Sequence, residues 1–212
     1  MYFRRVRRLD LPASLAERIL NEVTSDRLIP TGMKESTPQD NPSVNYNLNG
    51  AQLNKKLSDD IYSYYDEFLK MVPDAPKIII KRITSTVGGI PAHTDKGQTS
   101  TFTCVISGGG AETIWYEPTA DFLEKYREAD GARHRYKKAV SAPESELRKV
   151  TSITLQPWEM ILFDHNALHS VSNVQRDSER ILFSIGFLNI TQTELEDIYD
   201  EWYIKNKKDQ MC

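Results

Sequence analysis

Hydrophobic residues recur at helical spacing in the first third of the chain. Over residues 12–23, leucine, isoleucine and valine stand three or four positions apart, and the proline at position 12 suits the first turn of a helix. Over residues 51–71, a stripe of Leu, Ile, Tyr and Phe lies opposite Lys and Asp, and the prolines that follow end the pattern. The spacing predicts two amphipathic helices that cover another layer.

Between these helices the hydrophobic pattern is lost. Residues 30–49 are rich in Pro, Ser, Thr and Asn, which is typical of a long loop. Long loops in compact domains often form a lid or a rim, so Asn45, Tyr46 and Asn47 are candidates to face a substrate. A plain surface connection is the alternative.

From residue 77 onward the pattern changes to short strands separated by Gly, Pro, Asn and Ser. The expected strands cover residues 77–84, 90–95, 99–106, 112–116, 150–155, 160–163, 168–174 and 180–189. Eight short strands fit an antiparallel jelly roll of two facing sheets, so we expect a mainly β fold with flanking helices. Residues 193–206 return to helical spacing and predict a helix packed over a sheet.

This pattern predicts one domain over residues 1–212. Residues 1–76 would form a helical support with a loop, residues 77–190 the jelly-roll core, and residues 191–212 the C-terminal helix. The charged segment 118–149 interrupts the strand rhythm and is expected to be an insertion on the surface or at the mouth of the barrel.

The composition excludes several classes of protein. The hydrophobic fraction of 39% and charged fraction of 27% are those of an ordinary soluble domain, and no apolar run approaches the length needed to span a bilayer. A net charge of −3 gives no strong nucleic-acid signal. Two cysteines, Cys104 and Cys212, do not form a disulfide framework, so we expect a cytoplasmic protein with no membrane partner.

The last expected strand has two different faces, because side chains alternate along a strand. One face is wholly apolar; the other carries Arg180, Leu182, Ser184 and Gly186. A guanidinium that points into a barrel needs an anion, since an unpaired buried charge is costly. A bound carboxylate ligand would supply one, and an ion pair with Asp164 or Glu159 is the alternative.

Two histidines and an aspartate form a candidate metal site. His93 and Asp95 stand two apart in a strand and point the same way, and His169 can supply a second imidazole. Two imidazoles and one carboxylate on one face of a metal match the facial arrangement of non-haem Fe(II) oxygenases. His165 competes with His169, but it falls in an expected turn, so His169 is preferred.

The ordered set His93-Thr94-Asp95, then His169-Ser170-Val171, then Arg180 resembles the Fe(II)- and 2-oxoglutarate-dependent dioxygenase superfamily in its prolyl-4-hydroxylase-like branch. The resemblance covers residues 77–189 and implies a double-stranded β-helix. It implies that His93, Asp95 and His169 hold Fe(II), and that Arg180 pairs with the distal carboxylate of 2-oxoglutarate. Ser184 and Tyr116 are candidates to help hold the cosubstrate.

The resemblance also implies an activity. O2 and 2-oxoglutarate would be consumed in the hydroxylation of a C–H bond, with a prolyl or other peptidyl residue favoured over a small molecule as substrate. Asp95 favours hydroxylation over halogenation, because halogenating relatives replace this carboxylate. A non-catalytic, cupin-like jelly roll that binds a metal or ligand is the main alternative, and a purely structural jelly roll is another.

Overall fold

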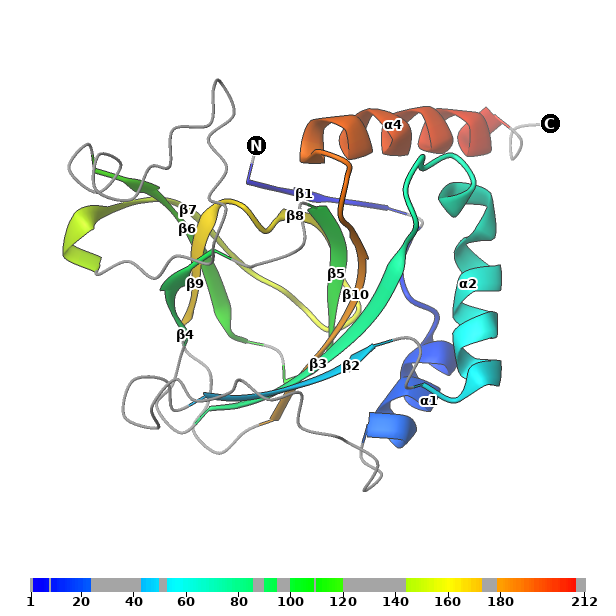
Figure 1. Ribbon diagram of the computed structural model, residues 1–212, viewed down its shortest axis with the longest axis horizontal. Coiled ribbons are helices and arrows are strands. Elements are labelled where there is room, and N and C mark those ends of the chain that lie inside the picture. The colour runs from blue at the N-terminus through cyan, green and yellow to red at the C-terminus, as the bar shows by residue number, and fades with distance from the viewer. Residues whose placement is uncertain are drawn as a thin grey trace.

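The computed structural model consists of two antiparallel sheets with helices on one side (Figure 1). It describes residues 2–7, 9–23, 43–49, 53–85, 90–94, 100–108, 110–119, 144–172 and 179–208. The larger sheet contains, in spatial order, β1 (Phe3–Arg5), β8 (Met160–Asp164), β5 (Ser100–Ser107), β10 (Glu179–Phe187), β3 (Lys77–Ser85) and β2 (Ser43–Asn49). The smaller sheet contains β4 (Ile90–His93), β9 (Leu168–Ser172), β6 (Glu112–Pro118) and β7 (Leu147–Thr154).

The eight strands β3 to β10 form the jelly roll that the sequence predicts. The chain passes from one sheet to the other after every strand in this run except β6, which pairs directly with β7. Strands that are distant in sequence therefore become neighbours, such as β5 with β10 and β4 with β9. The mainly β fold with flanking helices is confirmed.

The larger sheet is covered on both faces. Its outer face carries apolar side chains such as Phe102, Cys104 and Phe183, which pack in one core with the helices. These helices are α1 (Ala13–Val23), α2 (Lys55–Leu69) and α4 (Gln192–Lys208). Its inner face meets the smaller sheet, where Val105 and Phe163 join Trp115 in a second core. The alternation predicted for the last strand is confirmed, because Phe183 lies in the first core and Leu182 packs against the second.

The prediction of a loop over residues 30–49 is wrong for its last seven residues, 43–49. Residues 43–49 form β2, in which Asn45, Tyr46 and Asn47 pair with residues of β3. The backbone of these residues is engaged at the edge of the larger sheet, and residues 30–42 lie outside the described residues. Strand β7 also begins earlier than predicted, at Leu147, after a short 3-10 turn over Glu144–Glu146. Most of the predicted insertion, residues 120–143, lies outside the described residues.

The N-terminal strand ties the C-terminal helix to the larger sheet. Strand β1 pairs with β8, and Arg4 within it makes two hydrogen bonds of 2.6 and 2.8 Å to the Asp200 carboxylate of α4. The Tyr199 hydroxyl accepts from the Arg7 backbone N–H at 2.7 Å and donates to the Arg7 carbonyl at 3.1 Å. The C-terminal helix predicted from the sequence is present.

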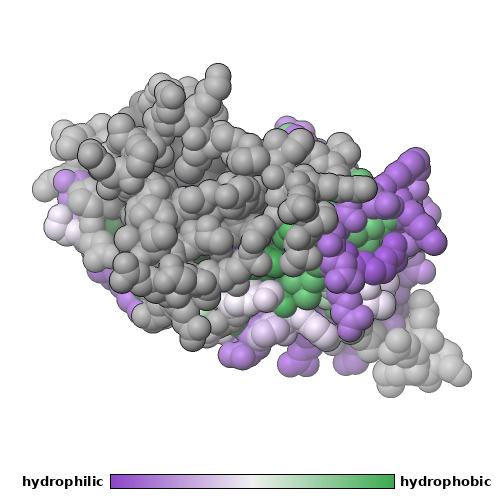
Figure 2. Space-filling view, turned by 90° about the horizontal axis from the view of Figure 1, so that it is seen from below, coloured by the Kyte–Doolittle hydropathy of each residue, from purple (hydrophilic) through white to green (hydrophobic). Residues whose placement is uncertain are grey.

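The described surface carries only scattered apolar side chains. Figure 2 shows one face, on which hydrophilic residues gather at one end beside a small group of hydrophobic ones. The large hydrophobic residues with the highest exposure are Tyr64, Val150, Trp158 and Ile204, and these belong to four different segments. Single exposed apolar residues are ordinary, so they indicate no docking surface. Among the described residues, no helix has the length and apolar character needed to cross a membrane.

Asp74 joins the end of β10 to the connection that precedes β3. Its carboxylate accepts hydrogen bonds of 2.8 Å from the backbone N–H groups of both Leu188 and Asn189, and one of 3.1 Å from the Asn189 side chain. Burial raises the pKa of this carboxyl, but these hydrogen bonds and one from the Ala75 backbone outweigh it, so the pKa lies below its usual value. The ionised carboxylate therefore holds the strand that carries Arg180.

We expect Asp74→Ala to lower the free energy of unfolding at neutral pH by about 1–3 kcal/mol, because four donors lose a charged acceptor. A lowered folded-state pKa means that this stabilisation is present above the unfolded-state pKa of about 4 and is lost as the pH falls below it. The difference between wild type and variant in urea denaturation should therefore shrink in acid. Asp66→Ala, which removes only a surface pair with Lys70, is the control. Equal stability of Asp74→Ala and wild type at pH 7 would refute this role.

Candidate metal and cosubstrate site

His93 and His169 meet between neighbouring strands of the smaller sheet. They are directly opposite each other in the pairing of β4 with β9, and their ring centroids are 4.5 Å apart. His169 is buried, and its Nδ1 lies 2.9 Å from the carbonyl oxygen of Ala167. A carbonyl only accepts, so Nδ1 carries the proton, and in the neutral ring the lone pair is then on Nε2, the tautomer that a metal ligand requires. The two imidazoles predicted as ligands are thus brought together in a suitable tautomer for His169.

The third predicted ligand, Asp95, lies outside the described residues. Within the described part of the chain, no group of three His, Cys, Asp or Glu side chains is placed to hold a metal ion. The His93 and His169 pair therefore fits a metal that takes its remaining protein ligand from outside that part, and Asp95 two positions after His93 stays the prediction for it.

His165 is close to this pair but has a different environment. Its ring centroid lies 6.1 Å from that of His169, and both rings contact Phe163, at 4.6 and 4.8 Å. The side chain is buried, and its Nε2 lies 2.6 Å from the Thr101 hydroxyl on β5. The preference for His169 over His165 agrees with this geometry, because Nε2 of His165 is already engaged with a protein group.

Arg180 is a buried cation that forms no ion pair with any residue that the structure describes. It is the second residue of β10, is 3% exposed, and shares the inner face of that strand with Leu182 and Ser184. Among the described residues, none accepts a hydrogen bond from its Nε. Burial alone lowers the pKa of Arg180, to about 10, so it stays charged at neutral pH.

The alternative partners for Arg180 are engaged elsewhere. Glu159 forms an ion pair of 2.7 Å with Arg5, and the Asp164 carboxylate accepts at 2.9 Å from the Asn166 backbone N–H. The prediction of a structural ion pair between Arg180 and either residue is therefore wrong. A second buried donor is Trp115, which lies opposite His169 in the pairing of β6 with β9; its indole N–H has no partner among the described residues. Buried donors in this state favour a bound acceptor.

A line of hydroxyl groups crosses the floor of the barrel. Thr101 and Thr103 lie on the inner face of β5, and Ser184 lies opposite Thr103 on β10. Their hydroxyl oxygens follow one another at 2.9 Å, from Thr101 to Thr103 and from Thr103 to Ser184. Ser184 was a candidate from the sequence, but Thr101 and Thr103 were not. Their alternation in the run Thr101-Phe102-Thr103 places both on one polar face of a strand.

Tyr116 is not brought to the other candidates. It pairs with Leu168 across β6 and β9, one position away from the Trp115 and His169 pair, so it points to the opposite face of the smaller sheet. It packs there with Ala92 and Leu168, and its hydroxyl contacts the Ser170 hydroxyl at 2.9 Å. The structure therefore does not support a role for Tyr116 in holding a cosubstrate inside the barrel.

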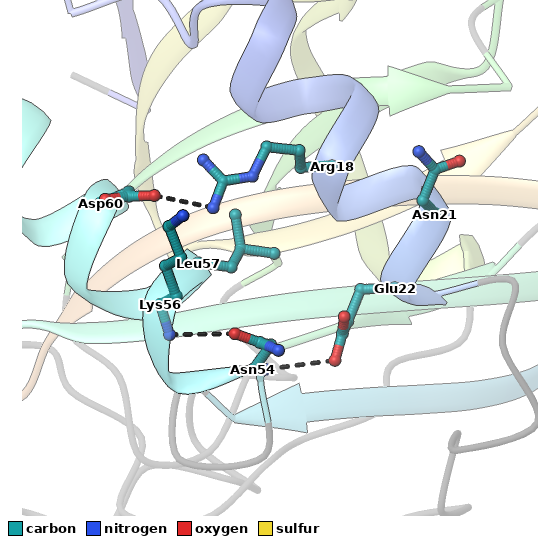
Figure 3. Close-up of a pocket in the computed structure, with 7 residues that line it drawn as sticks. All are labelled: Arg18, Asn21, Glu22, Asn54, Lys56, Leu57 and Asp60. Atoms are coloured by element: carbon teal, nitrogen blue, oxygen red, sulfur yellow. Dashed lines mark hydrogen bonds and ion pairs between the residues drawn. The ribbon is translucent and has the colours of Figure 1, made fainter.

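A surface depression lies apart from these residues, between α1 and α2 (Figure 3). Its volume is about 510 Å³, and its lining is formed by Arg18, Asn21, Glu22, Asn54, Lys56, Leu57 and Asp60. Three of its polar groups are used in helix packing and capping: Arg18 pairs with Asp60 at 2.7 Å, and the Asn54 side chain accepts from the first turn of α2. This depression is therefore part of the helical layer.

Comparison with solved structures assigns the fold. The chain resembles a prolyl hydroxylase from Trichoplax adhaerens in complex with a peptide fragment of hypoxia inducible factor, with a TM-score of 0.55, 11% identity, and coverage of 88% of this chain and 83% of that one. It also resembles SnoN, a non-heme alpha-ketoglutarate-dependent epimerase from nogalamycin biosynthesis, with a TM-score of 0.52, 13% identity, and coverage of 88% and 78%.

Escherichia coli ycfD is a further similar structure, with a TM-score of 0.45 and 12% identity, and this chain spans only 42% of its length. No family model matches the chain, and no curated protein matches it in sequence. At these identities the likeness concerns the fold, which is the double-stranded β-helix of the Fe(II)- and 2-oxoglutarate-dependent dioxygenases.

We expect Arg180→Met to stabilise the ligand-free protein by about 1–4 kcal/mol, because it removes an unpaired buried charge and keeps the volume filled. A base whose folded-state pKa is lowered destabilises the fold while charged, and this cost fades only as the pH rises through that pKa towards the unfolded value. The difference in free energy of unfolding between Arg180→Met and wild type, measured by urea denaturation, should therefore be constant near neutral pH. Arg4→Met, which breaks the bond to Asp200, should instead be neutral or destabilising. A large loss of stability in Arg180→Met would mean that this residue has a structural partner.

Proposed function

We propose that this protein is an Fe(II)- and 2-oxoglutarate-dependent oxygenase that hydroxylates a C–H bond. The observation that carries the proposal is the buried Arg180, whose Nε has no acceptor among the described residues, inside the same barrel as the His93 and His169 pair. A donor-only cation in an enclosed site calls for an anionic ligand, and a dicarboxylate with a keto group can reach both a metal and a guanidinium. The fold, shared with enzymes of this kind, supports the same reading.

Each residue has a role in this proposal. His93, His169 and Asp95 would hold Fe(II), and Arg180 would bind the distal carboxylate of 2-oxoglutarate, with Ser184 on the same strand face as a further polar contact. Fe(II) bound with 2-oxoglutarate would activate O2, so that one oxygen atom enters succinate as 2-oxoglutarate loses CO2 and the other enters the substrate C–H bond. The contact of Phe163 with His169 gives that ligand an apolar neighbour, which limits water at the site.

The proposed substrate is a prolyl or other peptidyl residue. Support comes from the likeness to the Trichoplax prolyl hydroxylase, which was solved with a peptide. The likeness to SnoN, from nogalamycin biosynthesis, supports a small molecule instead. Peptides that contain proline, tested for stimulated conversion of 2-oxoglutarate to succinate and for a mass increase of one oxygen atom, would distinguish these two classes.

We expect 2-oxoglutarate to bind the Fe(II)-loaded protein under anaerobic conditions and to produce a weak charge-transfer band in the visible region. Arg180→Met should weaken the binding of 2-oxoglutarate at least tenfold, about 1.4 kcal/mol, and leave the affinity for Fe(II) unchanged. His169→Ala should weaken the binding of Fe(II) itself. Tyr116→Phe, which changes the opposite face of the sheet, is the control and should bind Fe(II) and 2-oxoglutarate as wild type does. Iron binding by wild type without any response to 2-oxoglutarate would instead indicate a non-catalytic, cupin-like binding protein.

A further inference from the structure

The buried hydroxyl line on the floor of the barrel ends at a histidine. His165 Nε2 lies 2.6 Å from the Thr101 hydroxyl, which is followed at 2.9 Å by Thr103 and at 2.9 Å by Ser184. All four side chains are buried, and they come from β10, β5 and the turn that follows β8. One continuous hydrogen-bonded chain therefore joins the neighbourhood of His169 to the strand that carries Arg180.

The bonds of this chain can run uniformly in either of two directions. Thr101 and Thr103 each contact two partners within it, and a hydroxyl has one proton, so each can donate to only one of them. A proton on Nε2 of His165 allows every bond to run away from the histidine, which leaves the Ser184 proton to donate into the barrel. If Nε2 is a lone pair, every bond runs towards the histidine and Ser184 donates to Thr103 instead.

We propose that His165 is a positioning residue that keeps its proton on Nε2 and thereby turns Ser184 into a donor for the bound 2-oxoglutarate. The inference rests on the proposed function, because it takes the ligand near Arg180 to be an anionic diacid. Such a ligand accepts hydrogen bonds and gives none when ionised, so only the first direction completes its contacts.

Two observations favour that direction. Arg180 does not donate to Ser184 or to any other described residue through Nε, so Ser184 is not needed as an acceptor for the guanidinium. The two side chains instead lie on the same face of β10 as separate donors. Hydrogen bonds in a buried line also polarise one another, so a donor at the start strengthens the donor at the end.

The tautomer is directly measurable, because the chain contains only 4 histidines. Nitrogen NMR of the Zn(II)-loaded, diamagnetic protein with 2-oxoglutarate bound should show a protonated Nε2 on His165. The resonance is assigned from its loss in His165→Gln. A lone pair on Nε2 would overturn the proposal, because the chain would then run the other way.

Affinity for 2-oxoglutarate gives a second test, in which the two directions predict opposite results. In the proposed direction, Thr103→Val leaves the Ser184 hydroxyl unoriented and weakens the binding of 2-oxoglutarate by about three- to tenfold. Thr103→Ser keeps the hydroxyl that bonds to Ser184 and should bind 2-oxoglutarate as wild type does. In the opposite direction, Thr103→Val frees the Ser184 proton, so 2-oxoglutarate binds equally well or better. Valine has the shape of threonine, which keeps the fold intact.

Changes at His165 complete the series. His165→Gln retains an N–H donor towards Thr101 and should bind 2-oxoglutarate within about twofold of wild type, whereas His165→Leu should weaken it as Thr103→Val does. Fe(II) affinity should be unchanged throughout. Unchanged 2-oxoglutarate affinity in both Thr103→Val and His165→Leu overturns this inference alone. Failure of wild type to bind 2-oxoglutarate overturns the proposed function and this inference with it.

Discussion

The burial of the larger sheet on both faces is the constraint on which the rest of the structure depends. Helices cover its outer face, and the smaller sheet covers its inner face. Polar groups on the inner strands therefore cannot rely on bulk water and must find partners within the barrel. Thr101, Thr103 and Ser184 form hydrogen bonds with one another, whereas the Nε of Arg180 and the indole N–H of Trp115 have no acceptor among the described residues. Of these two, only Arg180 carries a charge.

The jelly-roll topology brings the proposed functional groups to one place. His93 and His169 belong to strands that are far apart in the chain, and the pairing of β4 with β9 sets their rings side by side. Arg180 reaches the same interior from the other sheet, because β10 runs between β3 and β5. The two histidines therefore lie on the smaller sheet and the guanidinium on the larger one, each on the strand face that is turned towards the other sheet.

The likeness in fold at 11–13% identity follows from the same physics. A covered sheet requires alternation of side chains and closely packed apolar residues, and many sequences meet these requirements. The chemistry requires only a few residue types at defined positions on the strands. A chain can therefore keep this fold while nearly all of its residues change, and its function has to be argued from those few positions.

The elements that could be predicted from the sequence are those with a local pattern of hydrophobic and polar residues. The eight strands from β3 onward, the two faces of β10 and the pairing of His93 with His169 as candidates all followed from alternation and spacing. Strand β2 was missed although Val44, Tyr46 and Leu48 alternate with polar residues, because the segment around it is rich in Pro, Ser, Thr and Asn, which is typical of a loop.

The candidate site divides in the same way. The sequence by itself determined that Arg180 and Ser184 share a face, since that depends only on the period of a strand. Only the tertiary structure decided that Tyr116 points away from His169, that Asp164 and Glu159 are engaged elsewhere, and that His165 is joined to Thr101. These facts depend on which strands become neighbours, and contacts between residues distant in sequence leave no local periodic signal.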